Sequence, residues 1–199
     1  MASQLFIHIT LPDGTRKQVP AGCTVREALT PEGGRLDAKV LAAKINGEPM
    51  DLSRPLEQDA TIEPLTFESA EGREVYRHSS THIMAQAVKE VFPTAQLTIG
   101  PALDDGFYYD FAFDRPFTPE DLEKIEARAI EIMKRGLTVT RSELSKQDAI
   151  KFFQERGEGY KVELINSFDD ASPISLYRQG EFVDLCRGPH LPTTGYVGA

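Results

Sequence analysis

The stretch Glu74–Val91, EVYRHSSTHIMAQAVKEV, decides the fold of the larger part of this 199-residue chain. Val75, His82 and Gln86 recur on one side of a helical projection, with Ile83, Ala87 and Val91 beside them. This pattern predicts one long helix over these residues. Pro93 lacks a backbone donor and ends the helical pattern. The sequence therefore predicts a long helix that carries His82 beside a row of apolar residues.

The residues before this helix predict a small β-rich domain over residues 1–65. Alternating apolar and polar residues indicate strands, and the Thr24/Glu27 spacing indicates a capping box that opens a short helix. The expected elements are strands at Gln4–Thr10, Arg16–Val19, Val40–Ile45 and Ala60–Leu65, a helix through Leu29, and a tight turn at Asn46-Gly47. The order β-β-α-β-β predicts a ubiquitin-like β-grasp fold. The polar, glycine-containing stretch Phe67–Arg73 is predicted to be a linker.

The residues after the helix complete a larger α+β domain over residues 66–199. Thr118 and Pro119 suit the start of a second helix, and Gly136 suits its end. The other expected elements are strands at Leu97–Pro101 and Phe107–Phe113, joined around Asp104-Asp105-Gly106, strands at Leu137–Thr140 and Tyr160–Ile165, a helix at Lys146–Arg156, and a hairpin from Ile174 to Leu185. The expected fold class is α+β, a small β-grasp domain followed by a larger α+β domain.

Composition excludes several classes of protein. The net charge of -9 argues against binding nucleic acid through a broadly basic surface, so any RNA must be recognised by local groups. No segment reaches the roughly 20 apolar residues of a membrane helix, and the N-terminus does not read as a signal peptide. The two cysteines, Cys23 and Cys186, lie far apart, which does not suggest a disulfide framework. We expect a cytoplasmic protein with no membrane partner.

Two motifs carry the side chains with the most distinctive chemistry. His78 and His82 are four residues apart on the predicted helix, so their side chains lie on one face about 6 Å from each other. Cys186 and His190 repeat this spacing in the segment Asp184–His190, DLCRGPH. Three of the four histidines and one of the two cysteines fall in these motifs, which predicts a functional site.

The residue types alone leave three kinds of chemistry open. Two histidines, a cysteine and a third histidine form a four-ligand zinc set, structural if all four bind and catalytic if one position is left to water. A metal-free site is also open, in which imidazoles position a water and a nearby lysine or aspartate completes the site. A cysteine–histidine nucleophile pair ranks last, because no acyl-enzyme signature supports it.

Longer motifs around these residues resemble the N-terminal half of the bacterial threonyl-tRNA synthetase family. The matching segments are Arg77–His82, Ile99–Pro101, Gly106–Asp110, Gly159–Val162 and Asp184–His190. They follow the order expected for that family, and together with the first domain the match covers essentially the whole chain. The first domain resembles the TGS domain of the family, and the second resembles its editing domain.

The resemblance implies an aminoacyl-tRNA deacylase that removes serine from the 3′ terminal adenosine of mischarged tRNA(Thr). Serine lacks one methyl group of threonine, so a threonine pocket rejects it by only about 1–3 kcal/mol, and a second, hydrolytic site supplies the missing discrimination. The implied catalytic residues are His78, His82, Lys161, Asp184, Cys186 and His190. The implied substrate-binding residues are Tyr109, Asp184, which would hold the α-amino group, and Arg187. Without the resemblance, Lys161 reads as a solvated strand residue.

The resemblance also implies which cofactors and partners to expect. Editing in this family is expected to need no cofactor. Related alanyl editing proteins, however, hold zinc with four residues that correspond to His78, His82, Cys186 and His190 of this chain. A zinc-binding alanyl-type editing domain and a non-catalytic tRNA-binding module with structural zinc are therefore the alternatives. The parent enzyme would attach threonine using ATP and a further zinc in an absent synthetic domain, and would dimerise through absent domains. We expect the editing domain to be truncated near Ala199.

Overall fold

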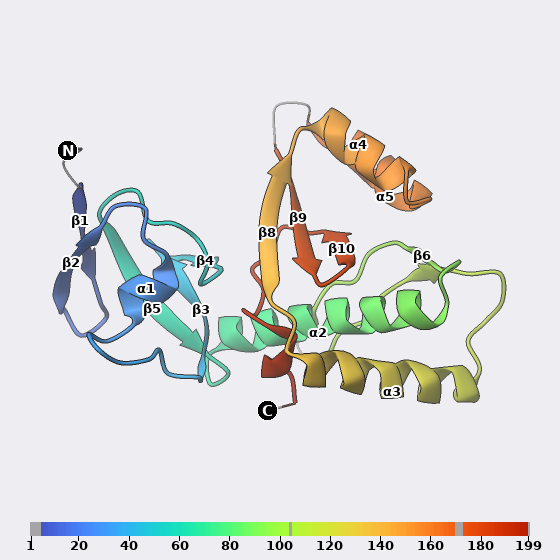
Figure 1. The fold of residues 1–199 in the computed structure, drawn as a ribbon, viewed down its shortest axis with the longest axis horizontal. Helices are drawn as coiled ribbons and strands as arrows, with labels where there is room; N and C mark the ends of the chain where they lie inside the picture. The colour runs from blue at the N-terminus through green and yellow to red at the C-terminus, as the bar shows by residue number, and fades with distance from the viewer. Residues whose placement is uncertain (1–4, 104, 170–172, 199) are drawn as a thin grey trace. The chain divides into compact units, whose positions relative to one another are not determined.

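The structure, a computed structural model, describes residues 5–103, 105–169 and 173–198, which form two compact units. The first unit contains the chain through Tyr76 and the short segment Gly188–Pro192, and the second contains the other residues. Both units mix helices and strands, as predicted for an α+β chain (Figure 1). The division falls inside a helix, so the predicted domain boundary at residues 65 and 66 stays a prediction.

The first unit has the predicted β-grasp arrangement. Its elements are β1 (Phe6–Thr10), β2 (Arg16–Pro20), α1 (Val25–Leu29), β3 (Val40–Ile45), β4 (Glu48–Met50) and β5 (Ala60–Thr66). The strand order is β2-β1-β5-β3-β4, with β1 parallel to β5 and the other pairs antiparallel. Apolar residues of the strands and of α1, including Ile9, Val25 and Ile62, form the core.

Local hydrogen bonds explain why the short elements of this unit were predictable. The Thr24 hydroxyl accepts a hydrogen bond from the Glu27 N–H at 3.2 Å, and the Glu27 carboxylate accepts one from the Thr24 N–H at 2.7 Å. This capping box opens α1 as predicted. Strand β4 was not predicted. It contains Pro49 and lies at the sheet edge, where proline is tolerated.

The second unit combines a helix pair with a small antiparallel sheet. Its elements are α2 (Ala70–Val91, in this unit from Arg77 on), β6 (Gln96–Leu97), β7 (Phe111–Ala112), α3 (Pro119–Arg135), β8 (Val139–Leu144), α4 (Lys146–Gln154), α5 (Gly159–Asn166), β9 (Ile174–Gln179), β10 (Phe182–Leu185) and the 3₁₀ helix η1 (Thr194–Tyr196). Helices α2 and α3 lie side by side (Figure 1) and share an apolar core. The sheet has the order β10-β9-β8, and residues of α4 and α5 share a core with it.

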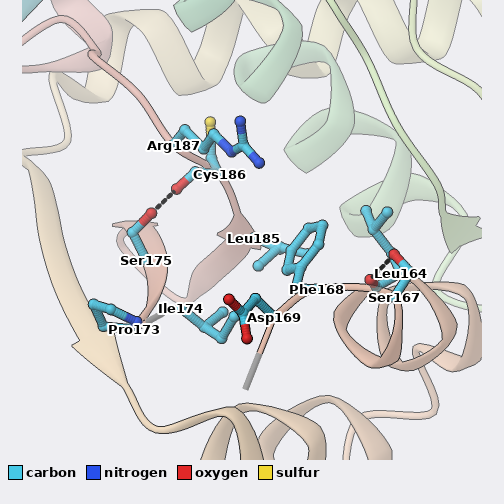
Figure 2. Close-up of a pocket in the computed structure, with 10 residues that line it drawn as sticks. All are labelled: Leu164, Ser167, Phe168, Asp169, Pro173, Ile174, Ser175, Leu185, Cys186 and Arg187. Carbon is cyan, nitrogen blue, oxygen red and sulfur yellow. Dashed lines mark hydrogen bonds between the residues drawn. The ribbon is translucent and has the colours of Figure 1, made fainter. Parts of the chain in front are cut away.

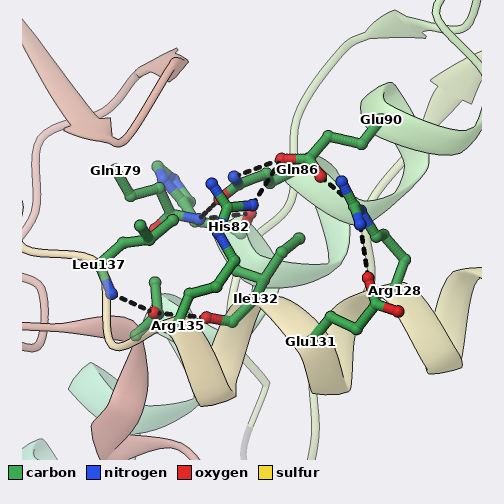
Figure 3. Close-up of polar contacts among 10 residues, drawn as sticks. His82, Gln86, Glu90, Arg128, Glu131, Ile132, Arg135, Leu137 and Gln179 are labelled. Carbon is green, nitrogen blue, oxygen red and sulfur yellow. Dashed lines mark hydrogen bonds and ion pairs between the residues drawn. The ribbon is translucent and has the colours of Figure 1, made fainter.

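A chain of polar contacts holds α2 against its neighbours in this unit (Figure 3). The buried Gln179 amide on β9 donates to the His82 carbonyl at 3.1 Å and to the Gln86 amide oxygen at 2.8 Å. Gln86 in turn donates to Glu90 at 2.7 Å, and Glu90 pairs with Arg128 of α3. Gln179 is buried, so breaking these bonds would leave its amide nitrogen without a hydrogen-bond partner. The bonds therefore fix the rotation of α2 relative to the sheet.

The predicted linker at Phe67–Arg73 was wrong, because α2 begins at Ala70. The Ser69 hydroxyl accepts a hydrogen bond from the Gly72 N–H at 3.0 Å, which satisfies a donor of the first helical turn. A Cβ atom at Gly72 would lie 1.9 Å from the Thr66 carbonyl oxygen. The glycine that suggested a flexible linker therefore lets the helix start directly beside the end of β5.

The predicted strand at Tyr160–Ile165 was also wrong, because these residues form α5. Lys161 and Ile165 are both buried, at 2% and 0% exposure, and their spacing of four residues is that of a helix face. Gly157, with a φ of 71°, follows the end of α4 and lets a second helix start at Gly159. The aromatic and branched residues of this segment are typical of a strand. The residues that are buried, however, lie four apart, which is the spacing of a helix face.

Other elements differ only in their extent. The strands predicted around residues 97–101 and 107–113 pair regularly only at β6 and β7, although backbone bonds join Thr98 and Ile99 to Asp110 beyond them. Strand β8 runs over Val139–Leu144 rather than 137–140, and α4 ends at Gln154 rather than at residue 156. The predicted α3 and the 174–185 hairpin are confirmed. Asp104, in the predicted connection, lies outside the described residues.

Among the described residues, no helix is both long and apolar enough to cross a membrane.

The close approach at Gly72 leads to a stability prediction. We expect Gly72→Ala to lower the free energy of unfolding by roughly 1–3 kcal/mol, because the new methyl group must displace the backbone at Thr66. Gly34→Ala is the matched control, since a Cβ there would meet Pro31 at an ordinary 3.4 Å. Chemical denaturation of both variants tests this, and equal stability of the two would contradict it.

Candidate functional site

Three of the four side chains in the two motifs come together in the second unit. His78 and His82 lie one turn apart on α2, with ring centroids 5.6 Å apart and ring planes at 88°. Cys186 follows the end of β10, and its Sγ lies 3.1 Å from His78 Nε2. One ligand atom from each of the three residues lies within 4.8 Å of the others. They form a possible metal-binding cluster of histidine and cysteine side chains.

The fourth motif residue, His190, belongs to the short segment that groups with the first unit. Its side chain is buried, and its backbone N–H donates a hydrogen bond to the Asp51 carboxylate at 2.8 Å. Because His190 follows Cys186 by only four residues, the chain keeps it within about 14 Å of the cluster. Its role beside the other three side chains stays a prediction.

A buried ion pair lies beside the cluster. Lys161 on α5 and Asp184 on β10 face each other with Nζ and Oδ1 2.7 Å apart, and both are at most 2% exposed. The Tyr109 hydroxyl donates to Asp184 Oδ2 at 2.7 Å and accepts a hydrogen bond from Lys161 at 3.1 Å. His82 Nε2 lies 3.8 Å from the same Asp184 oxygen. Lys161, Asp184, Tyr109 and His82, which come from separate elements of the fold, therefore contact one another at this pair.

Burial and the neighbouring charges determine which of these groups are ionised. Burial lowers the pKa of His82 to about 3, and the nearby Asp184 carboxylate only partly offsets this, so its ring is neutral at physiological pH. Burial raises the pKa of Asp184, but the Lys161 ammonium and the hydrogen bonds of Lys161 and Tyr109 outweigh it, so that pKa is lowered overall. Burial and Asp184 raise the pKa of Tyr109 well above its usual value, so Tyr109 remains a hydrogen-bond donor.

A second buried carboxylate positions the helix that carries Lys161. Glu158 immediately precedes α5 and accepts a hydrogen bond from the Leu97 N–H at 3.0 Å, while its other oxygen lies 2.7 Å from the Lys89 ammonium. Lys89 also donates to the carbonyls of Pro93 and Ala95. These bonds tie the start of α5 to the end of α2 and to β6. The sequence did not reveal Glu158, because it stands among charged and glycine residues that read as a solvated loop.

The position of Tyr109 depends on Gly100, which lies in the connection between β6 and β7. A Cβ atom at Gly100 would lie 2.2 Å from Tyr109 Cδ2 and 2.9 Å from the Tyr108 carbonyl. The Tyr109 ring occupies that space and stacks on Phe111 at 4.9 Å between ring centroids. Gly100 thereby allows the Tyr109 hydroxyl to reach Asp184 from the β6–β7 hairpin.

Arg187 does not join this buried group. Its side chain is exposed, and its guanidinium lies 6.0 Å from the centre of the Phe168 ring, beside a cavity of about 610 Å³. Figure 2 shows Phe168, Ser175 and Arg187 around this cavity. No local sequence pattern marks Phe168 or Ser175 as site residues. The expected substrate-binding role of Arg187 stays a prediction.

Two family models match separate parts of the chain. Residues 7–66 match the TGS domain model, and residues 174–199 match the model of the threonyl and alanyl tRNA synthetase second additional domain. The threonine–tRNA ligase of Symbiobacterium thermophilum is 53% identical over 97% of this chain. The threonine–tRNA ligases of Geobacter sp. strain M21 and Acidithiobacillus ferrooxidans are 51% and 52% identical over 97% and 96% of it.

This chain belongs with the N-terminal region of the threonine–tRNA ligases. It spans 30% of the length of each of these relatives. The resemblance predicted from the motifs around His78 and Cys186 is confirmed at this level. Cys186, Asp184 and Arg187 fall within the segment that matches the second additional domain.

The cluster has donors of the kind that zinc prefers. Zinc binds imidazole nitrogen at about 2.0–2.1 Å and thiolate sulfur at about 2.3 Å, usually with four ligands. Two ligands of one such ion lie between 3 and 4 Å apart by this geometry, which is near the 3.1 Å between Cys186 Sγ and His78 Nε2. The cluster therefore fits a zinc ion in donor type, and the spacing of Cys186 and His78 is compatible with one.

The buried ion pair leads to a second stability prediction. We expect Asp184→Asn to destabilise the fragment by about 3–5 kcal/mol, because it leaves the Lys161 ammonium buried without its partner. Glu143→Gln is the control, since Glu143 forms an ion pair with Arg141 at the surface of the same unit. Urea denaturation of both variants measures the difference. A loss no larger for Asp184→Asn than for Glu143→Gln would show that the buried pair does not hold the site together.

Proposed function

We propose that the second unit is an aminoacyl-tRNA deacylase that hydrolyses serine from the 3′ terminal adenosine of tRNA(Thr). The main support is the buried Lys161–Asp184 pair beside two imidazoles and a thiol, in a chain that matches threonine–tRNA ligases. The parent enzyme would attach threonine to tRNA(Thr) using ATP. The expected homodimer, formed through parts of the parent outside this sequence, and the cytoplasmic location belong to the same proposal.

Hydrolysis of the ester needs a water that loses a proton as its oxygen attacks the carbonyl carbon. His82, with a pKa near 3, is too weak a base to accept that proton efficiently. His78 is only partly buried and contacts Cys186, so we assign the proton acceptor role to His78. The carbonyl oxygen becomes an oxyanion, the bond to the ribose oxygen then breaks, and that oxygen takes up a proton. The products are free serine and tRNA with a free hydroxyl group.

The other side chains orient and stabilise this reaction. The Lys161 ammonium is the group that stabilises the developing oxyanion. Both oxygens of Asp184 already contact the protein, through Lys161 and the Leu185 N–H on one side and Tyr109 on the other. We therefore assign Asp184 to orienting Lys161 and Tyr109, rather than to binding the α-amino group of serine. Cys186 lines the site, and water is the nucleophile.

Variants of the proposed acceptor and cation test this function. We expect His78→Ala and Lys161→Ala each to slow single-turnover hydrolysis of seryl-tRNA(Thr) by the order of 10²-fold or more, as for a lost acid–base or electrostatic group. His8→Ala is the control, because His8 lies on β1 and contacts the exposed Asp59. Thermal unfolding of each variant separates lost chemistry from lost structure. Wild-type rates in both folded variants would refute the mechanism.

Zinc binding is the second candidate function, favoured by the spacing of the ligand atoms of His78, His82 and Cys186. These residues, completed by His190, would hold the ion, and a bound zinc would supply an acidified water or a structural knot. It would support either an alanyl-type editing domain or a non-catalytic tRNA-binding module.

Metal removal distinguishes these functions. We predict that the chain holds no stoichiometric zinc and that seryl-tRNA hydrolysis persists in a chelator, because the Lys161–Asp184 pair supplies charge without a metal. Elemental analysis after mild chelation measures the zinc content. One zinc per chain, with hydrolysis of alanyl rather than seryl esters, would favour the alanyl-type domain. Unfolding on chelation without any hydrolysis would favour the structural module.

A further inference from the structure

The cavity beside Cys186 is a part of the second unit that the proposed reaction does not use. It measures about 610 Å³ and lies between the end of α5, β9 and the segment after β10 (Figure 2). Cys186 belongs to both places: its Sγ contacts His78, while its carbonyl accepts a hydrogen bond from the Ser175 hydroxyl at 2.5 Å in the cavity wall. A ligand held at the cluster therefore has the cavity as its immediate neighbour.

The walls of the cavity combine an aromatic ring, a cation and the carboxylate of Asp169. Phe168 is half-buried against the core of α4, α5 and the sheet, which fixes its ring. The Arg187 guanidinium lies 6.0 Å from the centre of that ring. Aromatic rings and arginine side chains are the groups on which proteins stack single-stranded bases and bind phosphates.

The negative net charge of the chain makes this arginine important for binding an anion. With a net charge of -9, the protein as a whole does not attract a polyanion, so RNA must be held by local cations. The terminal nucleoside of an RNA carries no phosphate on its 3′ side. The phosphate nearest the ester is the one that links the terminal nucleoside to the nucleotide before it. A cation next to the reacting cluster is therefore placed for that phosphate.

We propose that this cavity binds the penultimate nucleotide of the tRNA. Its base stacks on Phe168, and its linking phosphate pairs with Arg187. The proposal rests on the proposed function and adds to it a second subsite, separate from the ester. The volume is within the range of about 300–1,000 Å³ that small-ligand sites occupy, so it accepts one nucleotide.

Two ligands that differ by one nucleotide test this subsite. The probes are a non-hydrolysable 3′-seryl-amide of adenosine and the same amide on a dinucleotide that ends in adenosine, and calorimetry measures their dissociation constants. We expect the dinucleotide to bind wild-type protein at least about tenfold more tightly, as stacking of one base allows. In Arg187→Ala and in Phe168→Leu this gain should fall below about threefold. Leucine keeps much of the apolar volume of Phe168, so the sheet core remains filled.

Arg156→Ala is the matched control. Arg156 also lies over an aromatic ring, with its guanidinium 3.6 Å from the centre of the Phe152 ring, but it does not line the cavity. This variant should retain the full gain from the second nucleotide. Equal affinity of wild-type protein for both probes, or an undiminished gain in folded Arg187→Ala and Phe168→Leu, refutes the subsite alone. Failure of wild-type protein to bind either probe refutes the proposed function and the subsite together.

Discussion

The second unit depends on one interaction, the ion pair between Lys161 and Asp184. Both charges are out of water, and each is stable there only while the other remains in place. Tyr109 and His82 complete the surroundings of the pair. Helix α5, strand β10, the β6–β7 hairpin and helix α2 each contribute one of these four side chains. A shift of any of the four elements would leave a buried charge or dipole without its partner. A change that disrupts the site would therefore also disrupt the packing of the unit.

Local signals in the sequence predicted the elements whose hydrogen bonds close within a few residues. The capping boxes at Thr24 and Thr118 each join residues three apart, and the structure confirms both helices. The sequence failed where distant contacts decide. The sequence pattern of residues 160–165 predicts a strand. In the structure these residues form a helix, in which Lys161 is buried against Asp184 of β10. Gly72 read as a flexible point, but its missing side chain is what allows a close contact with Thr66.

The candidate site shows the same limit. The spacing of His78 and His82 predicts a shared face, because one helix determines it, and Cys186 reaches the same place through the sheet. Family resemblance, rather than periodicity, pointed to Lys161 and Tyr109. Nothing pointed to Glu158, whose partner Leu97 lies 61 residues away in the chain. A buried carboxylate and an exposed one look the same in a sequence, because the fold alone supplies the partner that makes burial tolerable.

Gly100 has a consequence for anyone who would redesign the site around Tyr109. The residue touches no proposed substrate group and carries no side chain, yet a methyl group there would collide with the Tyr109 ring. The Tyr109 hydroxyl would then withdraw from Asp184, and the lysine would lose part of its alignment. A library that varies only the polar residues of the site would leave this constraint in place. A library that varies Gly100 would move the Tyr109 hydroxyl away from Asp184. It would thereby change the electrostatics of the site without altering a charged residue.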